Sequence, residues 1–259
     1  MIIEAIKDRI ETELLVFMDE LDREHFLSKT SPFLFRIIRE FTLRKGKRIR
    51  PILFLPGYLG FADRAAENLY HCALSIELLH NFTLVHDDII DKSLFQRGKP
   101  SMYAYLTEYL KKRRRIKFNV KDMAPASGDV MYALALSAFL TINECWDRKE
   151  KAFKRLIRSA VSTGSGEFME ILCGTTGLER MKKTEICKIY ELKTADYTFA
   201  IPLVTGAILA GADEKETGRL LRFGKNAGIA FQIKDDLLDI LDAERVGRRD
   251  PFIEVQEAN

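Results

Sequence analysis

Two acidic motifs of the form Asp-Asp-x-x-Asp lie far apart in the sequence, at Asp87–Asp91 and Asp235–Asp239. On a helix, the first and last carboxylates of such a motif lie one turn apart on one face, and the middle one lies about 100° round. Carboxylates this close repel one another, and on an apolar helix they need a partner of opposite charge. Mg²⁺, which prefers oxygen ligands, is the simplest such partner. If the two helices face each other, the motifs form two carboxylate walls around bound metal ions.

A chance origin for both motifs is improbable. With 17 Asp among 259 residues, random order would give roughly 0.07 matches per chain, and two matches in roughly 0.3% of chains. Both motifs also follow apolar segments, Phe82–His86 and Phe231–Lys234. The alternative is that each motif is an acidic helix face in contact with solvent.

Basic residues that could bind a phosphate ester occur at four places in the sequence. His80 lies seven residues before Asp87, which places it on the same helical face about 10 Å along the axis. Three further basic segments are Gly46–Pro51, Arg97–Pro100 and Lys193-Thr194. Any one of them alone would be read as solvated surface, and His80 alone as a core histidine. Together with two metal-binding walls, they describe a site for phosphate esters.

The elements that must position these residues are predicted to be helices. Long stretches lack both Gly and Pro, and their apolar residues recur every three or four positions. The segment 69–90 is apolar nearly all round, which suits a helix buried inside a bundle. Breaks are expected at Gly57/Gly60, Gly98–Pro100, Pro125–Gly128, Thr163–Gly166, Gly174–Gly177 and Gly206–Gly211. We therefore predict an all-α fold of about ten helices, without a β-hairpin signal.

Composition excludes several classes of protein. Hydrophobic residues make up 47% and charged residues 31%, with a net charge of +3, as in an ordinary soluble domain. The four cysteines lack disulfide-framework or zinc spacing, which favours reduced thiols in the cytoplasm. The N-terminus lacks the apolar block of a secretory signal, and no apolar run reaches membrane-spanning length. The basic cluster Lys111–Arg115 is read as a solvated loop, because no nucleic-acid module accompanies it.

These motifs, in this order, resemble the trans-isoprenyl diphosphate synthase (polyprenyl synthetase) family. The resemblance covers nearly the whole chain and rests on six segments: Gly46–Pro51, Asp87–Asp91, Arg97–Ser101, Gly128-Asp129, Lys193-Thr194 and Phe231–Asp239. It implies one domain over residues 1–259, C-terminally short, that is a helical bundle around a deep central cavity. It also implies a homodimer that condenses isopentenyl diphosphate with an allylic diphosphate, without nucleic acid and without a membrane span.

The resemblance implies a role for each matching residue. The diphosphate of isopentenyl diphosphate would be held by Lys47, Arg50, His80 and Arg97. Three Mg²⁺ ions bridging to the allylic diphosphate would be held by Asp87, Asp91 and Asp235, supported by Asp88, Asp236 and Asp239. Catalysis would depend on Lys193, Thr194, Gln232 and Lys234. In this scheme the two lysines neutralise the departing diphosphate, while Thr194 and Gln232 turn oxygen dipoles toward the allylic cation.

The resemblance also suggests a product length. Phe82 lies five residues before Asp87, where shorter-chain members of the family carry an aromatic floor. This favours a C20 product, geranylgeranyl diphosphate, followed by the C15 farnesyl diphosphate. On a regular helix Phe82 lies about 140° round from Asp87, so this role depends on the resemblance alone. The alternative is an ordinary core phenylalanine.

Three departures from the family pattern leave other functions open. Gln96 replaces the first Arg of an Arg-Arg-Gly turn, which should weaken binding of the allylic diphosphate. Glu167 replaces a usual Gln, and the chain ends at Asn259, soon after the second acidic motif. A non-catalytic subunit of a heteromeric prenyl synthase, a terpene cyclase or squalene/phytoene synthase-like enzyme, and a helical binding protein are the alternatives. Retention of both acidic motifs disfavours the first, and the Gly46–Pro51 segment disfavours a cyclase.

Overall fold

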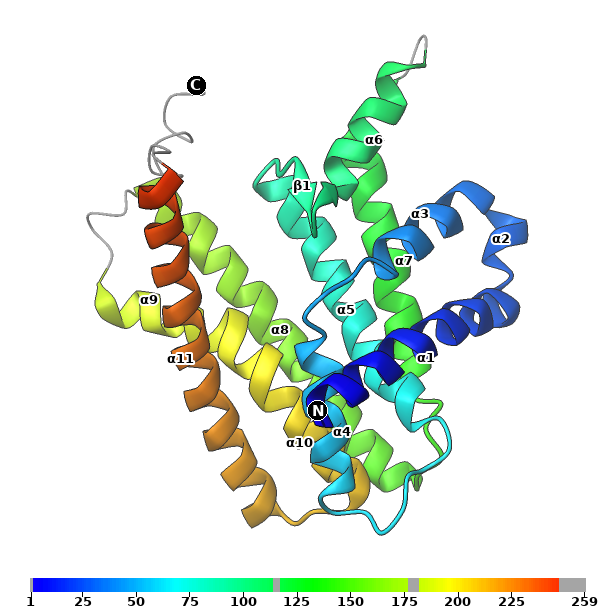
Figure 1. Ribbon diagram of the computed structural model, residues 1–259, viewed down its shortest axis with the longest axis vertical. Helices are drawn as coiled ribbons and strands as arrows, with labels where there is room; N and C mark the ends of the chain where they lie inside the picture. The colour runs from blue at the N-terminus through cyan, green and yellow to red at the C-terminus, as the bar shows by residue number, and fades with distance from the viewer. Residues whose placement is uncertain (1, 114–116, 177–181, 247–259) are drawn as a thin grey trace.

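The computed structural model describes residues 2–113, 117–176 and 182–246, and these residues form a predominantly helical assembly (Figure 1). Arg114 and Arg115 of the basic cluster, and the chain after Val246, lie outside the described residues. The elements are α1 (Ile2–His25), α2 (Leu27–Thr30), α3 (Pro32–Thr42), α4 (Ile49–Leu59), α5 (Leu69–Ile90), β1 (Phe95–Gln96), β2 (Lys99–Pro100), α6 (Met102–Lys111), α7 (Val120–Phe139), α8 (Trp146–Thr176), α9 (Lys183–Ile189), the π-helix η2 (Tyr190–Ala200), α10 (Ile201–Ala210) and α11 (Glu214–Val246). The all-α prediction is confirmed.

Helix α5 is the central element of one half of the molecule. It packs against α7, α4, α1 and α6, and the eight residues from Cys72 to Leu79 are all buried. This is the buried helix that the apolar segment 69–90 predicts. Its C-terminal end carries the first acidic motif and points toward the same end of the molecule as the C-terminal part of α11 (Figure 1).

Helices α4 and α10 approach so closely that their backbones touch. A Cβ atom on Gly57 would lie 2.4 Å from the carbonyl oxygen of Leu203, and one on Gly206 would lie 2.5 Å from that of Phe54. No side chain larger than hydrogen fits at either position, so the two glycines form a joint that we call the glycine joint. The glycine joint connects α4, whose first turn contains Arg50, to α10, which follows η2.

The segment η2 is wound more widely than an α-helix, with the i→i+5 pattern that frequently marks functional sites. Its side chains Lys193, Thr194, Tyr197 and Thr198 all line one cavity. Helix α11 packs on the other side, where Gly228 allows close approach to Ala195. Because of this wide winding, the pairs Lys193-Thr194 and Tyr197-Thr198 both turn toward the cavity.

A short β-ribbon departs from the sequence-based expectation of helices alone. Strands β1 and β2 pair antiparallel around Arg97 and Gly98, whose φ angles of 55° and 73° are both positive, as a tight hairpin turn needs. Arg44 donates to the carbonyl oxygen of Pro100 at 2.9 Å and so holds the ribbon. Gly60 and Gly211 do end helices, as predicted.

Other expected breaks are wrong, because the residues lie inside continuous helices: Gly57 in α4, Pro125–Gly128 in α7, Thr163–Gly166 and Gly174 in α8, and Gly206 in α10. Several of these glycines serve close packing instead of chain reversal. Gly128 lies against the ring of His86, and Gly166 lies against Leu192. Within the described ranges, no helix is long and apolar enough to cross a membrane.

Candidate functional site

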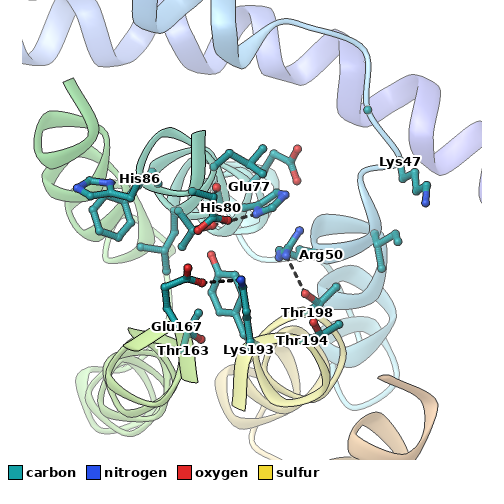
Figure 2. A pocket seen from close by; sticks show the side chains of 18 of the residues that line it. Lys47, Arg50, Glu77, His80, His86, Thr163, Glu167, Lys193, Thr194 and Thr198 are labelled. Atoms are coloured by element: carbon teal, nitrogen blue, oxygen red, sulfur yellow. Dashed lines mark hydrogen bonds and ion pairs between the residues drawn. The ribbon is translucent and has the colours of Figure 1, made fainter. Parts of the chain in front are cut away.

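A cavity of about 1000 Å³ opens between the α5 half of the molecule and the half formed by α8, η2 and α11. Its lining includes residues from every motif described above except Gly128-Asp129, and Figure 2 shows several of these side chains converging on it. Of the predicted site residues, those on the cavity lining are Lys47, Arg50, His80, Phe82, Asp87, Arg97, Lys193, Thr194, Gln232 and Asp235. Lys234 is exposed on α11 and is not among the lining residues.

The first acidic motif occupies the end of α5. Asp87 lines the cavity, and its burial, followed by the nearby charge of Glu167, raises the pKa of its carboxyl to about 7. Asp88 is 1% exposed. One of its oxygens accepts from the Gln96 amide at 3.3 Å, and the other has no partner in the described structure. Burial raises the pKa of Asp88 to about 6. Asp91 caps the helix and is exposed at its end.

The second acidic motif lies on α11. The carboxylate of Asp235 lies 3.5 Å from the Lys47 ammonium. Asp236 accepts from the amide of Gln232 at 2.6 Å and from the hydroxyl of Tyr190. The Asp239 side chain lies outside the described residues. Asp87 and Asp235 thus line the same cavity from different helices, although no three potential metal ligands converge on one point within the described part of the chain.

A group of cations forms another wall of the cavity. Arg50 donates to the Thr198 hydroxyl at 2.7 Å, and Arg97 donates to the carboxylate of Glu77 at 3.0 Å. Glu77 also accepts from Arg48 at 2.6 Å, deep beneath the wall. Burial by itself would raise the pKa of Glu77, but the charges of Arg48 and Arg97 outweigh it and lower that pKa. Glu77 therefore remains ionised and fixes the two guanidinium groups.

His80 lies beside these cations. Burial, followed by the charges of Arg50 and Arg97, lowers the pKa of its imidazole well below the usual range. The ring is therefore neutral at physiological pH and adds a hydrogen-bonding group to the wall without adding charge. Its Nδ1 atom lies 3.2 Å from the Thr83 hydroxyl, which fixes the orientation of the ring.

Lys193 is the charged group of the wall formed by η2 and α8. Its ammonium lies 2.6 Å from the carboxylates of both Glu167 and Glu170, and Figure 2 shows it pointing at Glu167. Burial tends to lower the pKa of Lys193, but hydrogen bonds to these carboxylates outweigh that effect and raise it. The next residue, Thr194, donates to Gln232 on α11 at 2.7 Å.

One part of the cavity lining carries three rings that are tilted against one another. The ring of Phe82 lies 4.5 Å from that of His86 and 5.1 Å from that of Tyr132. The Nδ1 atom of His86 lies 3.0 Å from the Phe82 carbonyl oxygen. The cluster is tied to α7, because a Cβ on Gly128 would lie 2.6 Å from the His86 ring. We call Phe82, His86 and Tyr132 the aromatic cluster.

Sequence reasoning missed several residues of the site, among them Glu77, Tyr197 and Thr198. Glu77 could have been found as the one ionisable carboxylate in an otherwise apolar stretch of α5, three residues before His80. Tyr197 and Thr198 lie about one turn after Lys193-Thr194 and could have been found from helical spacing. The departure at Gln96 acquires a function as well, because its amide is the hydrogen-bond partner of Asp88.

Comparison with known proteins gives consistent results. The sequence profile of the polyprenyl synthetase family matches residues 31–250. A geranylgeranyl diphosphate synthase of Cyanophora paradoxa is 32% identical over 235 residues, which are 85% of this chain and 72% of that protein. Component 2 of the heptaprenyl diphosphate synthase of Bacillus subtilis is 35% identical over 199 residues, covering 77% of this chain and 51% of that protein.

A solved structure agrees with these relatives. The geranylgeranyl pyrophosphate synthetase of the archaeon Geoglobus acetivorans superposes with a TM-score of 0.75 at 29% identity. The superposition covers 93% of this chain and 70% of that one. The chain therefore spans about half to three quarters of the length of the proteins it matches.

Proposed function

Since the chain belongs to the polyprenyl synthetase family, we propose that it is a trans-prenyltransferase that condenses isopentenyl diphosphate with an allylic diphosphate. One observation carries this proposal. A single cavity is lined by carboxylates of both acidic motifs, by a wall of arginines and by an apolar aromatic cluster. Two diphosphates and one growing hydrocarbon chain need these three environments together. A one-substrate cyclase would have no use for the Arg50 and Arg97 wall.

The carboxylates fit Mg²⁺ held jointly by protein and substrate. Burial and neighbouring carboxylates raise the pKa of Asp87 to about 7, so Lys193 offsets the negative charge at this wall only in part. The donors are oxygen atoms, which Mg²⁺ prefers, and it commonly takes one or two carboxylates together with water and phosphate oxygens. Asp87, Asp91 and Asp235 would hold the ions, with Asp88, Asp236 and Asp239 in support. Three bound Mg²⁺ ions would supply electrostatic stabilisation of the departing diphosphate.

Different residues of this chain act at different steps of the proposed reaction. Arg50 and Arg97, with Lys47 and His80, hold isopentenyl diphosphate by its diphosphate group. Lys193 offsets the charge that develops as the allylic C–O bond breaks and its electron pair leaves with diphosphate. The double bond of isopentenyl diphosphate then supplies the electron pair of the new C–C bond. A proton is lost from the adjacent carbon to the released diphosphate, so no protein nucleophile is needed.

Two side chains of this chain surround the cation that forms between these events. Thr194 and Gln232, which are hydrogen-bonded to each other, present oxygen dipoles toward it. The apolar lining of the cavity excludes the water that would otherwise quench it. Lys234, which is exposed and off the cavity lining, is the weakest member of the proposed catalytic set.

The favoured product is short. The named function of the Cyanophora and Geoglobus relatives supports the C20 geranylgeranyl diphosphate, and the aromatic cluster supports a limit on chain growth. The C15 farnesyl diphosphate is the next candidate. A homodimer in the cytoplasm also remains part of the proposal; the free cysteines among the described residues are consistent with a reducing compartment.

A second function is favoured by one comparison. The similarity to component 2 of a heptaprenyl diphosphate synthase supports a subunit of a heteromeric prenyl synthase. The deciding experiment incubates the purified chain with radiolabelled isopentenyl diphosphate, Mg²⁺ and a C5, C10 or C15 allylic starter, and measures product length. We expect elongation to C20 that stops when a chelator is added. Absence of elongation with every starter would refute an enzyme that acts alone and would leave the subunit function.

A further inference from the structure

The hydroxyl of Tyr197 is a buried polar group that the proposed reaction does not yet use. Tyr197 lies on η2, lines the cavity and is only 2% exposed. Its hydroxyl makes no well-formed hydrogen bond among the described residues, although the Thr83 side chain lies close enough to interact with it. The neighbouring Thr83 hydroxyl donates to the His80 carbonyl oxygen at 2.8 Å. Buried hydroxyls are nearly always hydrogen-bonded, so an unpaired one on a cavity wall calls for a partner from outside the protein.

Two other donors near Tyr197 share this property. The guanidinium of Arg50 lies 4.8 Å from the centre of the Tyr197 ring, in the position of a cation–π contact. Nε of Arg50 and Nη1 of Arg97 are buried and unpaired in the described structure, although other nitrogens of both groups are bonded. Among the described residues, one wall therefore presents three donors that lack a well-formed hydrogen bond. A ligand with several anionic oxygens would satisfy all three.

We propose that Tyr197 is a further substrate-binding residue, whose hydroxyl donates a hydrogen bond to the diphosphate that Arg50 and Arg97 hold. This inference rests on the proposed function, which places isopentenyl diphosphate at that wall. The ring orients the Arg50 guanidinium through the cation–π contact, while the hydroxyl adds a donor to the same anion. Burial raises the pKa of Tyr197 above its ordinary value, so the hydroxyl keeps its proton at physiological pH.

Substitution of Tyr197 by Phe isolates the hydroxyl, because the ring and its contact with Arg50 remain. A hydrogen bond to a charged group contributes about 1.5–3 kcal/mol, and so its loss should weaken binding by about ten- to a hundredfold. The protein itself should lose little stability, because the Thr83 side chain beside this hydroxyl keeps its own hydrogen bond to the His80 carbonyl oxygen. Weaker binding without weaker folding is the result that distinguishes a ligand contact from a structural contact.

Tyr58 provides a matched control. It is also 2% exposed and lies on α4, the helix of Arg50, but its hydroxyl donates to Glu144 and it does not line the cavity. Tyr58→Phe removes a partnered hydroxyl. It should therefore lower the melting temperature and leave the affinity for the diphosphate unchanged, which is the reverse of the effect expected for Tyr197→Phe.

The experiment titrates isopentenyl diphosphate and, separately, inorganic pyrophosphate into each full-length protein by calorimetry, in the presence of a chelator so that the carboxylate walls cannot take part. Melting temperatures and the KM for isopentenyl diphosphate are measured on the same samples. We expect Tyr197→Phe to weaken both ligands and to raise KM with little change in kcat.

Three outcomes overturn specific statements. Wild-type affinity of Tyr197→Phe for both ligands, or weakening confined to isopentenyl diphosphate, refutes the hydrogen bond to the diphosphate. A fall in melting temperature as large as that of Tyr58→Phe assigns Tyr197 a structural role. Failure of the wild-type protein to bind isopentenyl diphosphate refutes the proposed function itself.

Discussion

Glu167 illustrates how one residue changes the charge balance of the site. It stands where the family usually has Gln, and its carboxylate lies 2.6 Å from the Lys193 ammonium. After burial, the same carboxylate makes the largest contribution to the raised pKa of Asp87. A neutral Gln would do neither. The acidic wall and the lysine that faces it are therefore coupled through a residue that belongs to neither motif.

The aromatic cluster allows a prediction about chain length. Phe82→Ala would remove the ring that contacts both His86 and Tyr132 and would open space at that part of the cavity lining. We expect products one or more C5 units longer, with the rate of the first condensation within about tenfold of wild type, because the diphosphate-binding groups are unchanged. The measurement is thin-layer chromatography of radiolabelled products.

Phe153→Ala is the control for this prediction. Phe153 packs against Phe139 and does not line the cavity, so its loss should reduce stability without altering product length. An unchanged product from Phe82→Ala would mean that another part of the cavity limits chain growth.

At the residue scale, the sequence predicted most positions of the site but few of their contacts. Helical spacing was sufficient to place His80 and Asp87 on the face of α5 that lines the cavity. It could not reveal that Gln96 donates to Asp88, because this bond depends on how the β-ribbon folds back over α5. Lys234 lies exposed on α11 and off the cavity lining, so its role stays a prediction from the motif.

At the scale of elements, the glycine joint determines how α4 and α10 meet. Gly206→Ala would place a methyl group 2.5 Å from the Phe54 carbonyl oxygen. Overpacking of this kind typically destabilises a protein by about 1–3 kcal/mol, and here backbone atoms must move to relieve it. We expect a lower melting temperature in a thermal unfolding experiment followed by circular dichroism.

Gly218→Ala is the matched helical control. Gly218 lies in α11, where the nearest atom to an added Cβ is 4.0 Å away. Alanine should stabilise this helix by up to about 1 kcal/mol, because it has the higher helix propensity. Equal effects of the two substitutions would show that helix propensity, and not the joint, determines the response at Gly206.

The joint also explains why the sequence misplaced several helix ends. Glycine was read as a break because it usually disfavours a helix. In α7, α8 and α10 the helices nevertheless continue, and Gly128, Gly166 and Gly206 lie where a neighbouring element approaches. Whether a glycine ends a helix or permits contact depends on tertiary neighbours, which one sequence does not reveal. The all-α class was predictable because hydrophobic periodicity over long segments is a local property.

At the scale of the whole molecule, the stability of the metal-free protein should depend on pH. In the folded protein Asp87 and Asp88 have pKa values of about 7 and about 6, above the ordinary value of 3.8. At these two carboxyls the folded state therefore binds protons more tightly than the unfolded state between about pH 4 and pH 7, which lowers stability as pH rises. The depressed pKa of His80 acts in the opposite direction below about pH 6.5 and offsets part of this fall. We expect the melting temperature in a chelator to fall on the order of 5 °C from pH 5 to pH 8.

Asp87→Asn tests the origin of this dependence. It removes the ionisable group with the higher of the two pKa values and should flatten the decline, most clearly between pH 6 and pH 8. A variant with the wild-type decline would assign the pH dependence to other groups. Addition of Mg²⁺ and inorganic pyrophosphate to the wild-type protein should restore stability at pH 8, because a ligand that binds only the folded state stabilises it.

The glycine joint has a kinetic consequence. Arg50 lies in the first turn of α4, on one side of the joint, and Lys193 lies in η2, which leads into α10 on the other side. The Arg50–Thr198 hydrogen bond links the two segments. Two substrates bound at these residues would be held by a frame without a flexible spacer. Well-oriented reactants can reach effective molarities of about 10⁵ M or more, and misplacement by about 1 Å can cost a factor of a hundred. The lack of a side chain at Gly57 and Gly206 allows this close packing, and it would thus help to determine how often the reacting carbons meet.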